Sequence, residues 1–206
     1  MVEYGYHTDP DITSLLVNSA EDDRSGVRTS ALSALSDVYA EYKGFILKGI
    51  RDKSYSVAGV SLSAYLQNES DPEPSIIEEF SKEQSIEIVA PMAEYFLAQN
   101  DHSQYEWFTW KLNTLKGTDL YYFLQYFSQY LITAPEGQKV NTIEPLFEMA
   151  LNASQYYVRL GAFQALSIIS DIAGVGEKIE TIKADESDPR LIYIYENLEV
   201  TIESEN

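Results

Sequence analysis

Apolar residues recur with the spacing of an α-helix along nearly the whole chain. In the segment 25–41, the stripe consists of Val27, Ala31, Leu35 and Val38. Such i, i+3, i+4 spacing is typical of a helix that buries one face. Segments rich in Gly, Asp, Ser and Pro interrupt the pattern and predict turns. The pattern predicts helices over about 11–20, 25–41, 45–50, 57–66, 76–80, 86–96, 105–110, 118–131, 142–151, 154–170 and 188–200. We read 134–137 and 174–176 as breaks between helices.

The helical pattern repeats with a period of thirty residues. Val27 and Val57 lie 30 positions apart, and so do Leu32 and Leu62. A later copy, residues 157–166, restores the Val-Arg dipeptide of residues 27–28. A fixed period of this size is typical of stacked helical repeats, in which each hairpin buries its apolar face against the next. We therefore predict an all-α, α–α superhelix, a HEAT-like or ARM-type solenoid of about six antiparallel helix pairs that forms a single domain over residues 1–206.

Composition narrows the classes of partner. The chain carries 33 acidic and 14 basic residues, a formal net charge of −19. This charge repels phosphate backbones and anionic lipid, so we expect no nucleic acid and no membrane among the partners. The chain has no cysteine, and no apolar run approaches the ~20 residues that span a bilayer. Residues 1–7 lack the basic and apolar segments of a signal peptide. None of this identifies the compartment.

Two arginines occupy the same position in the repeat. Arg28 and Arg159 each follow a core valine at the start of a second helix. There a guanidinium can reach an acidic residue of a neighbouring turn, and the candidates for Arg28 are Asp22, Asp23 and Asp52. One interpretation is a ligand-binding arginine. We favour a structural ladder of Arg28, Asp52 and Arg159, because a recurring position indicates a recurring architectural role. The ladder is incomplete, since the second repeat has Ala58 at this position.

Aromatic residues replace small ones between residues 103 and 134. A stripe at spacing four consists of Tyr122, Tyr126 and Tyr130. These rings could line a contact surface for a peptide or a partner domain. Alternatively, they fill wide gaps between helices, with their phenol groups at the rim. We favour packing, because aromatic stripes at helical spacing usually belong to a core.

No motif for catalysis, cofactor binding or metal binding emerges. The two histidines, His7 and His102, lack the spacing that places two imidazoles on one helical face. The serine of Gly59-Val60-Ser61 lacks the second glycine of a nucleophile elbow. We therefore predict no catalytic, cofactor-binding or metal-binding residue, and no enzymatic activity for this chain on its own.

The repeats resemble short HEAT-type repeats, and several of them resemble the C-terminal region of bacterial M1-family (gluzincin) aminopeptidases. The segments that carry this resemblance are Gly26-Val27-Arg28, residues 51–57, residues 157–163 and residues 188–191. The resemblance implies an all-helical domain that packs on a zinc-dependent catalytic domain and limits the access of substrates. The family's His-Glu-x-x-His and Gly-x-Met-Glu-Asn motifs have no counterpart here. Zinc is therefore expected only in a catalytic domain that this chain does not contain.

Two functional hypotheses follow. In the first, the chain is the non-catalytic C-terminal domain of an M1 aminopeptidase, and its partner is the catalytic domain of the same parent chain. In the second, it is a free-standing HEAT-repeat scaffold that binds another protein or a peptide. An independent hydrolase is the weakest alternative, because no nucleophile, base and orienting group can be assembled from the motifs.

Overall fold

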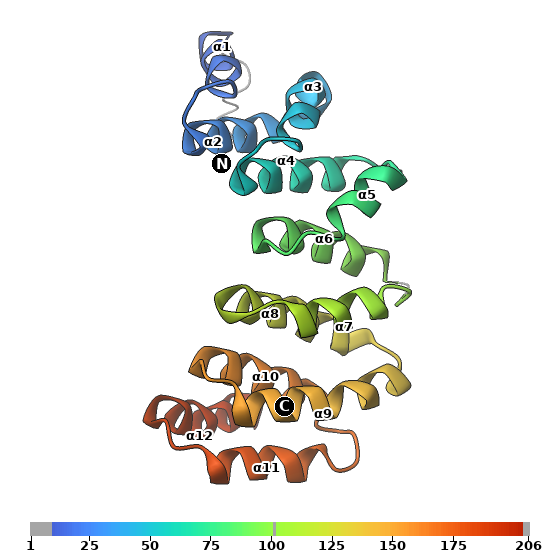
Figure 1. Cartoon of the computed structure of the whole chain (residues 1–206), viewed down its shortest axis with the longest axis vertical. Helices are drawn as coiled ribbons and strands as arrows, with labels where there is room; N and C mark the ends of the chain where they lie inside the picture. The colour runs from blue at the N-terminus through green and yellow to red at the C-terminus, as the bar shows by residue number, and fades with distance from the viewer. Residues whose placement is uncertain (1–9, 101, 204–206) are drawn as a thin grey trace. The chain divides into compact units, whose positions relative to one another are not determined.

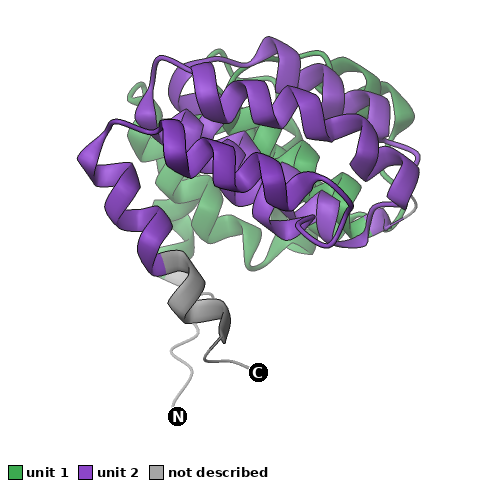
Figure 2. Cartoon of the chain, turned by 90° about the horizontal axis from the view of Figure 1, so that it is seen from below, with its two compact units in different colours: residues 1–98 green, residues 99–206 purple. Residues whose placement is uncertain are grey.

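The computed structural model describes residues 10–100 and 102–203, and the side chains up to residue 197. Within these residues every regular element is an α-helix, and there are twelve of them (Figure 1). This confirms the all-α class and shows packed helix pairs of a helical-repeat type. The chain divides into two compact units, residues 1–98 and 99–206 (Figure 2). The single continuous superhelix stays a prediction.

Unit 1 contains the first six helices: α1 (Pro10–Ser19), α2 (Ser25–Ser36), α3 (Tyr39–Gly49), α4 (Tyr55–Asn68), α5 (Pro74–Phe80) and α6 (Ile86–Gln99). Helix α2 packs against α1, α3 and α4, and α3 packs against α4. The core of unit 1 is mainly aliphatic and includes the thirty-residue pair Leu32 and Leu62, which are 2% and 0% exposed. The periodic positions identified from the sequence therefore form the interior of this unit.

Small residues bring the helices of unit 1 into close contact. A Cβ atom placed on Gly59 of α4 would lie 2.2 Å from the backbone oxygen of Glu87 in α6. A Cβ atom on Gly49 of α3 would lie 2.2 Å from the hydroxyl of Ser61 in α4. Both distances are far below van der Waals contact. At Gly59 the obstacle is backbone, so only glycine fits there, whereas at Gly49 the hydroxyl of Ser61 can rotate away.

The prediction of one helix over 25–41 is wrong. Helix α2 ends at Ser36 and α3 begins at Tyr39, with Val38 between them at φ −123° and ψ 40°. The break turns the ring of Tyr39 into the core, where its hydroxyl donates to Glu69 at the end of α4 over 2.7 Å. The apolar spacing continues across the break, so periodicity alone gave no sign of it.

Unit 2 contains the other six helices: α7 (Tyr105–Thr114), α8 (Gly117–Thr133), α9 (Glu136–Asn152), α10 (Tyr156–Ile168), α11 (Val175–Asp185) and α12 (Pro189–Glu203). Helix α10 packs against α8, α9 and α11, while α7 packs against α8 and α9 against α11. Rings fill the interior between α7 and α8. The ring of Phe108 stacks on the ring of Tyr130, with the two centroids 4.5 Å apart. Its centroid lies 5.9 Å from that of Phe123.

Two predictions for unit 2 change. Helix α9 begins at Glu136, six residues before the predicted start, so that the loop shrinks to Ala134 and Pro135. Helix α11 follows the break at Gly174, where no helix was expected. Gly174 adopts φ +84°, a conformation that suits glycine, and the helix starts at the next residue. The predicted start at Asp188-Pro189 is confirmed, because Asp188 accepts the backbone N–H of Arg190 over 3.0 Å.

Candidate functional site

Arg28 of α2 joins two consecutive hairpin turns of unit 1. Its Nε and Nη2 atoms donate to the two carboxylate oxygens of Asp52, each over 2.8 Å. Its Nη1 atom donates to the backbone carbonyls of Asp22 and Asp23 over 2.8 and 2.9 Å. The Arg28 side chain is 10% exposed. Of the three candidate partners, Asp52 thus supplies the carboxylate, and the other two supply only main-chain oxygens.

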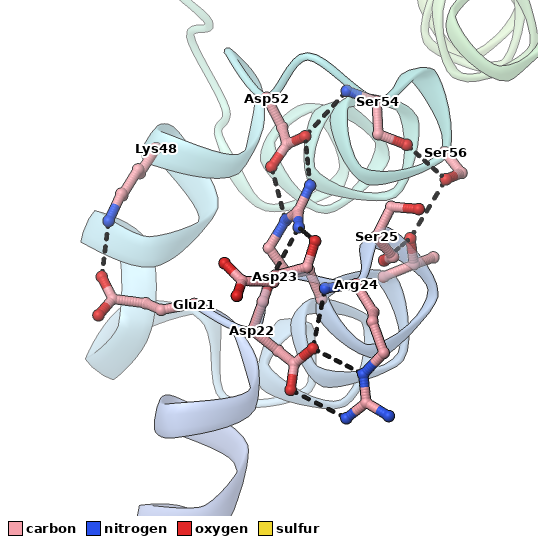
Figure 3. Close-up of polar contacts among 11 residues, drawn as sticks. Glu21, Asp22, Asp23, Arg24, Ser25, Lys48, Asp52, Ser54 and Ser56 are labelled. Carbon is pink, nitrogen blue, oxygen red and sulfur yellow. Dashed lines mark hydrogen bonds and ion pairs between the residues drawn. The ribbon is translucent and has the colours of Figure 1, made fainter.

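Asp52 also caps the helix that follows it. Its carboxylate accepts the backbone N–H of Ser54 over 2.8 Å, immediately before α4 (Figure 3). The hydrogen bond from Arg28 outweighs burial and holds the pKa of Asp52 below its ordinary value. One carboxylate therefore links α2 of one hairpin to the start of the second helix of the next.

Arg159 makes the corresponding junction in unit 2. Its Nε and Nη2 atoms donate to Glu186 over 3.0 and 3.2 Å, and Nη1 donates to the carbonyl of Ala153 over 2.9 Å. Burial raises the pKa of Glu186, but hydrogen bonds from Arg159 and from the backbone N–H groups of Asp188 and Ser187 outweigh it and leave the pKa lowered. Sequence reasoning identified Arg159 but missed Glu186. The carboxylate partner follows its arginine by 27 residues in unit 2 and by 24 residues in unit 1, so the spacing in unit 1 did not indicate Glu186.

A recess lies beside each junction. The recess at Arg28 has a volume of about 400 Å³, and the recess at Arg159 about 340 Å³. The guanidinium that lines each recess is already bound to a carboxylate and to carbonyls, which leaves it little capacity to bind a ligand. Three further cations line the first recess: Lys48, Arg51 and Lys53. Two of them are ion-paired on the surface, to Glu21 and Glu79. The junctions therefore serve architecture.

The three predicted tyrosines of α8 do not form one exposed stripe. Tyr122 is 48% exposed and Tyr126 is half-buried. Tyr130 is 3% exposed and lies among the rings of the core, where its hydroxyl donates to Gln138. Tyr130 therefore belongs to the packing of unit 2 and is excluded from any contact surface. The reason is geometric, because residues at spacing four drift around a helix that turns every 3.6 residues.

A different set of rings lies on the surface of unit 2. The ring centroids of Tyr122 and Tyr121 in α8 lie 5.5 Å apart, and those of Tyr157 and Tyr156 in α10 also lie 5.5 Å apart. The centroids of Tyr121 and Tyr157 are separated by 5.7 Å and join the two pairs. The guanidinium of Arg190 in α12 lies 3.7 Å from the centroid of the Tyr156 ring. One helical turn later on α12, Tyr193 is 69% exposed. We call this set the tyrosine face: Tyr121, Tyr122, Tyr156, Tyr157, Arg190 and Tyr193.

Sequence reasoning found one member of the tyrosine face, Tyr122. The other members come from three helices that are distant in sequence, so no single helical stripe contains them. A signal was nevertheless present. Tyr156 and Tyr157 begin the second helix of a hairpin, and they occupy the two positions immediately before the Val-Arg dipeptide that marks the repeat. Comparison of that position along the repeats would have selected them.

The helices of unit 2 differ sharply in charge. Helix α8 contains one charged residue, Asp119, and α10 contains one, Arg159, which is held in its junction. By contrast, α9 and α11 carry nine between them: Glu136, Lys139, Glu144, Glu148, Glu177, Lys178, Glu180, Lys183 and Asp185. In a chain of net charge −19, the α8–α10 surface is thus neutral and rich in hydroxyl and amide groups. Such a surface loses little hydration energy on contact with a polypeptide.

The described residues hold no group of three or more His, Asp or Glu side chains that could bind a metal ion. His102 contributes its backbone carbonyl to Tyr130 and Gln138, each over 3.4 Å, and His7 lies outside the described residues. None of the helices within 10–100 and 102–203 is both long and apolar enough to cross a bilayer. The expected lack of a cofactor or a catalytic residue stays a prediction.

The search against protein-family models and the search of curated proteins found no match to this chain. The resemblance to the C-terminal region of M1 aminopeptidases therefore stays a prediction from the repeat motifs.

Proposed function

We propose that this chain is a non-catalytic, protein-binding module of the helical-repeat type, and that the tyrosine face of unit 2 contacts the partner. The observation that carries the proposal is the row of rings that runs from Tyr122 and Tyr121 of α8 to Tyr157 and Tyr156 of α10, where the guanidinium of Arg190 in α12 lies over the last ring. Helices α8 and α10 carry only one charged residue each, and the two are of opposite sign. Tyrosine suits such a role, because it offers a large rigid contact area and a hydrogen-bonding hydroxyl at low entropic cost.

Exposure supports the choice of this surface. Tyr122 is 48% exposed, whereas the next residue of α8, Phe123, is fully buried, so the exposed ring projects from a helix that the core holds in place. The hydroxyls of Tyr121, Tyr122, Tyr156 and Tyr157 form no hydrogen bond with other described residues, so they are available to a partner's backbone. Such pre-ordered rings lower the entropic cost of binding.

A selection from a random peptide library tests the proposal. The full chain and a Tyr122→Ser/Tyr157→Ser variant serve as baits, and binding of each selected peptide is then measured in solution. We expect peptides that bind the native chain and bind the variant at least about tenfold more weakly, since buried aromatic contacts dominate interfaces. The matched control is Ile132→Ser/Val140→Ser, which alters two other exposed apolar residues, 60% and 46% exposed. Equal binding by the native chain and the tyrosine variant would contradict the proposal.

A narrower form of the same proposal is that the chain is the C-terminal domain of an M1 aminopeptidase. The partner is then the catalytic domain of the same parent chain. The coding sequence upstream of Met1 distinguishes the two forms. A His-Glu-x-x-His segment there supports the aminopeptidase domain, whereas a complete gene that starts at Met1 supports the free-standing scaffold.

The non-catalytic part of the proposal has its own test. The purified chain is expected neither to bind stoichiometric zinc nor to cleave aminoacyl anilide substrates. Chelator-sensitive turnover that persists through repurification would contradict it, independently of whether the tyrosine face binds peptides.

A further inference from the structure

Arg190 shows how the tyrosine face holds a cation. Its guanidinium lies over the ring of Tyr156, 3.7 Å from the centroid. The same guanidinium donates to both carboxylate oxygens of Asp188, from Nε over 2.9 Å and from Nη2 over 2.6 Å. The side chain is 62% exposed, so this arrangement forms at the surface. A ring face and a neighbouring carboxylate therefore contact the same guanidinium here.

Two further pairs of a ring and a carboxylate flank this arrangement. On α8, Asp119 precedes the exposed ring of Tyr122 by three residues, and on α12 Glu196 follows the exposed ring of Tyr193 by three residues. Residues three apart on a helix are neighbours on its surface. Each pair therefore offers the same two chemical groups, a ring and a carboxylate, as those that contact Arg190.

No cation of the chain occupies these two pairs. All fourteen lysines and arginines lie within the described residues, and none of them forms an ion pair with Asp119 or Glu196 or lies over the ring of Tyr122 or Tyr193. In the recess that Glu196 lines, Lys183 is paired with Glu180 over 3.1 Å. The acceptors for two external cations are thus built into the surface.

We propose that the tyrosine face binds an extended, arginine-containing segment of a partner protein. One guanidinium stacks on Tyr122 beside Asp119, and a second stacks on Tyr193 beside Glu196. The rings between them contact the intervening backbone. This inference rests on the proposed function and names the partner's chemistry. The net charge of −19 attracts such a segment at long range, and arginine fits better than lysine because its planar group stacks on a ring and pairs bidentately.

The test uses the full chain and a fluorescent peptide of about twelve residues, which spans about 40 Å when extended. Its arginines are spaced along a glycine–serine background, and binding is followed by fluorescence polarisation. A second peptide carries citrulline in place of arginine, which keeps the shape and removes the charge. We expect the citrulline peptide to bind at least about tenfold more weakly.

Variants of the protein locate the contact. Asp119→Asn, Tyr122→Leu, Tyr193→Leu and Glu196→Gln are each expected to weaken binding of the arginine peptide about threefold or more. The matched controls are Glu136→Gln on α9, an exposed carboxylate in the same unit, and Tyr55→Leu on α4, a ring that is 52% exposed. We expect the controls to change binding less than about twofold.

Three outcomes would overturn the inference. If Glu136→Gln weakens binding as much as Asp119→Asn, net charge alone attracts the peptide. If the citrulline peptide binds as tightly as the arginine peptide while Tyr122→Leu weakens both, the proposed function stands and the arginine preference is wrong. If no peptide of this series binds at about millimolar concentration, the preference is also wrong, and the library selection alone decides the proposed function.

Discussion

The α2–α4 pair of unit 1 and the α8–α10 pair of unit 2 share a repeat frame, by which we mean packed second helices of consecutive hairpins and an arginine junction. They differ in the size of the side chains that these helices carry. Each unit holds a largely buried arginine that binds a carboxylate and one or two carbonyls of a preceding turn. In unit 1 the second helices carry small residues, and Gly59 of α4 packs against the backbone of α6. In unit 2 the corresponding helices carry rings both in the core, at Phe123 and Phe163, and at the surface, at Tyr122.

The difference shows how one repeat frame yields two kinds of surface. Small residues allow backbones to approach closely and leave little side chain to contact a partner. Large rings such as Phe108 and Phe123 fill the core between α7 and α8, whereas Tyr122 of the same helix α8 is exposed to solvent. On this account the arginine junctions maintain the frame in both units, and the ring-rich helices carry the binding function in unit 2. The predictions below test this division, beginning with the largest expected effect.

The ring core is expected to be the most sensitive part of the molecule. Phe108 is fully buried and contacts four other rings. Phe108→Ala should lower the free energy of unfolding by about 3–5 kcal/mol, because it removes a large side chain and leaves a cavity. Urea unfolding of the native chain and of the variant measures this loss of free energy. Leu35→Ala in α2, also fully buried, should cost less, about 2–3 kcal/mol. A larger loss at Leu35 would break the comparison.

The arginine junction comes next. Arg28→Ala should lower the free energy of unfolding by about 3 kcal/mol, because it leaves Asp52 and two carbonyls without their donor. Thermal and urea unfolding both report it. The matched control is Arg24→Ala, which removes a guanidinium that is 77% exposed from its pair with Asp22 and should cost less than about 1 kcal/mol. If Arg28→Ala leaves the thermal and urea unfolding midpoints unchanged, the arginine ladder does not stabilise the fold and the prediction is wrong.

Two glycines sharpen the contrast between the units. Gly59→Ala should lower the free energy of unfolding by about 1–3 kcal/mol, since the new methyl group meets the backbone of Glu87. Gly161→Ala in α10 meets the side chain of Leu124 at 3.0 Å, which can adjust, and alanine gains about 1 kcal/mol of helix propensity. We therefore expect Gly161→Ala to be nearly neutral. Equal effects at the two sites would show that the close approach is not specific to unit 1.

The smallest effect concerns pH. The folded pKa values of Asp52 and Glu186 lie below the ordinary values, so their contribution to stability is present above about pH 4 and is lost as the pH falls through the folded values. The free energy of unfolding should therefore decline between about pH 5 and pH 2. Unfolding at several pH values measures this slope, and Arg28→Ala/Arg159→Ala should flatten it. The same slope in the variant would contradict the assignment.

The sequence predicted the frame well because the frame is periodic. Positions such as Leu32 and Leu62 recur at thirty residues and are buried, and Arg28 contacts Asp52 as expected. It failed where tertiary contacts override the period. The break at Val38 keeps helical spacing, and Glu186 becomes a partner only through packing of α11 and α12.

The tyrosine face was the hardest part to predict. Tyr130 shares its spacing with Tyr122 yet is buried, while Tyr157 and Tyr193 join the surface from other helices. A single helical stripe cannot reveal such a set, because its members become neighbours only when consecutive hairpins pack together.

The most direct test of the central claim is hydrogen–deuterium exchange of the full chain, with and without a peptide chosen by the library selection. The account predicts slower exchange of the backbone amides at the starts of α8, α10 and α12, and no change in α2 and α4. Protection confined to α2 and α4, or to the charged helices α9 and α11, would contradict the assignment of binding to the tyrosine face.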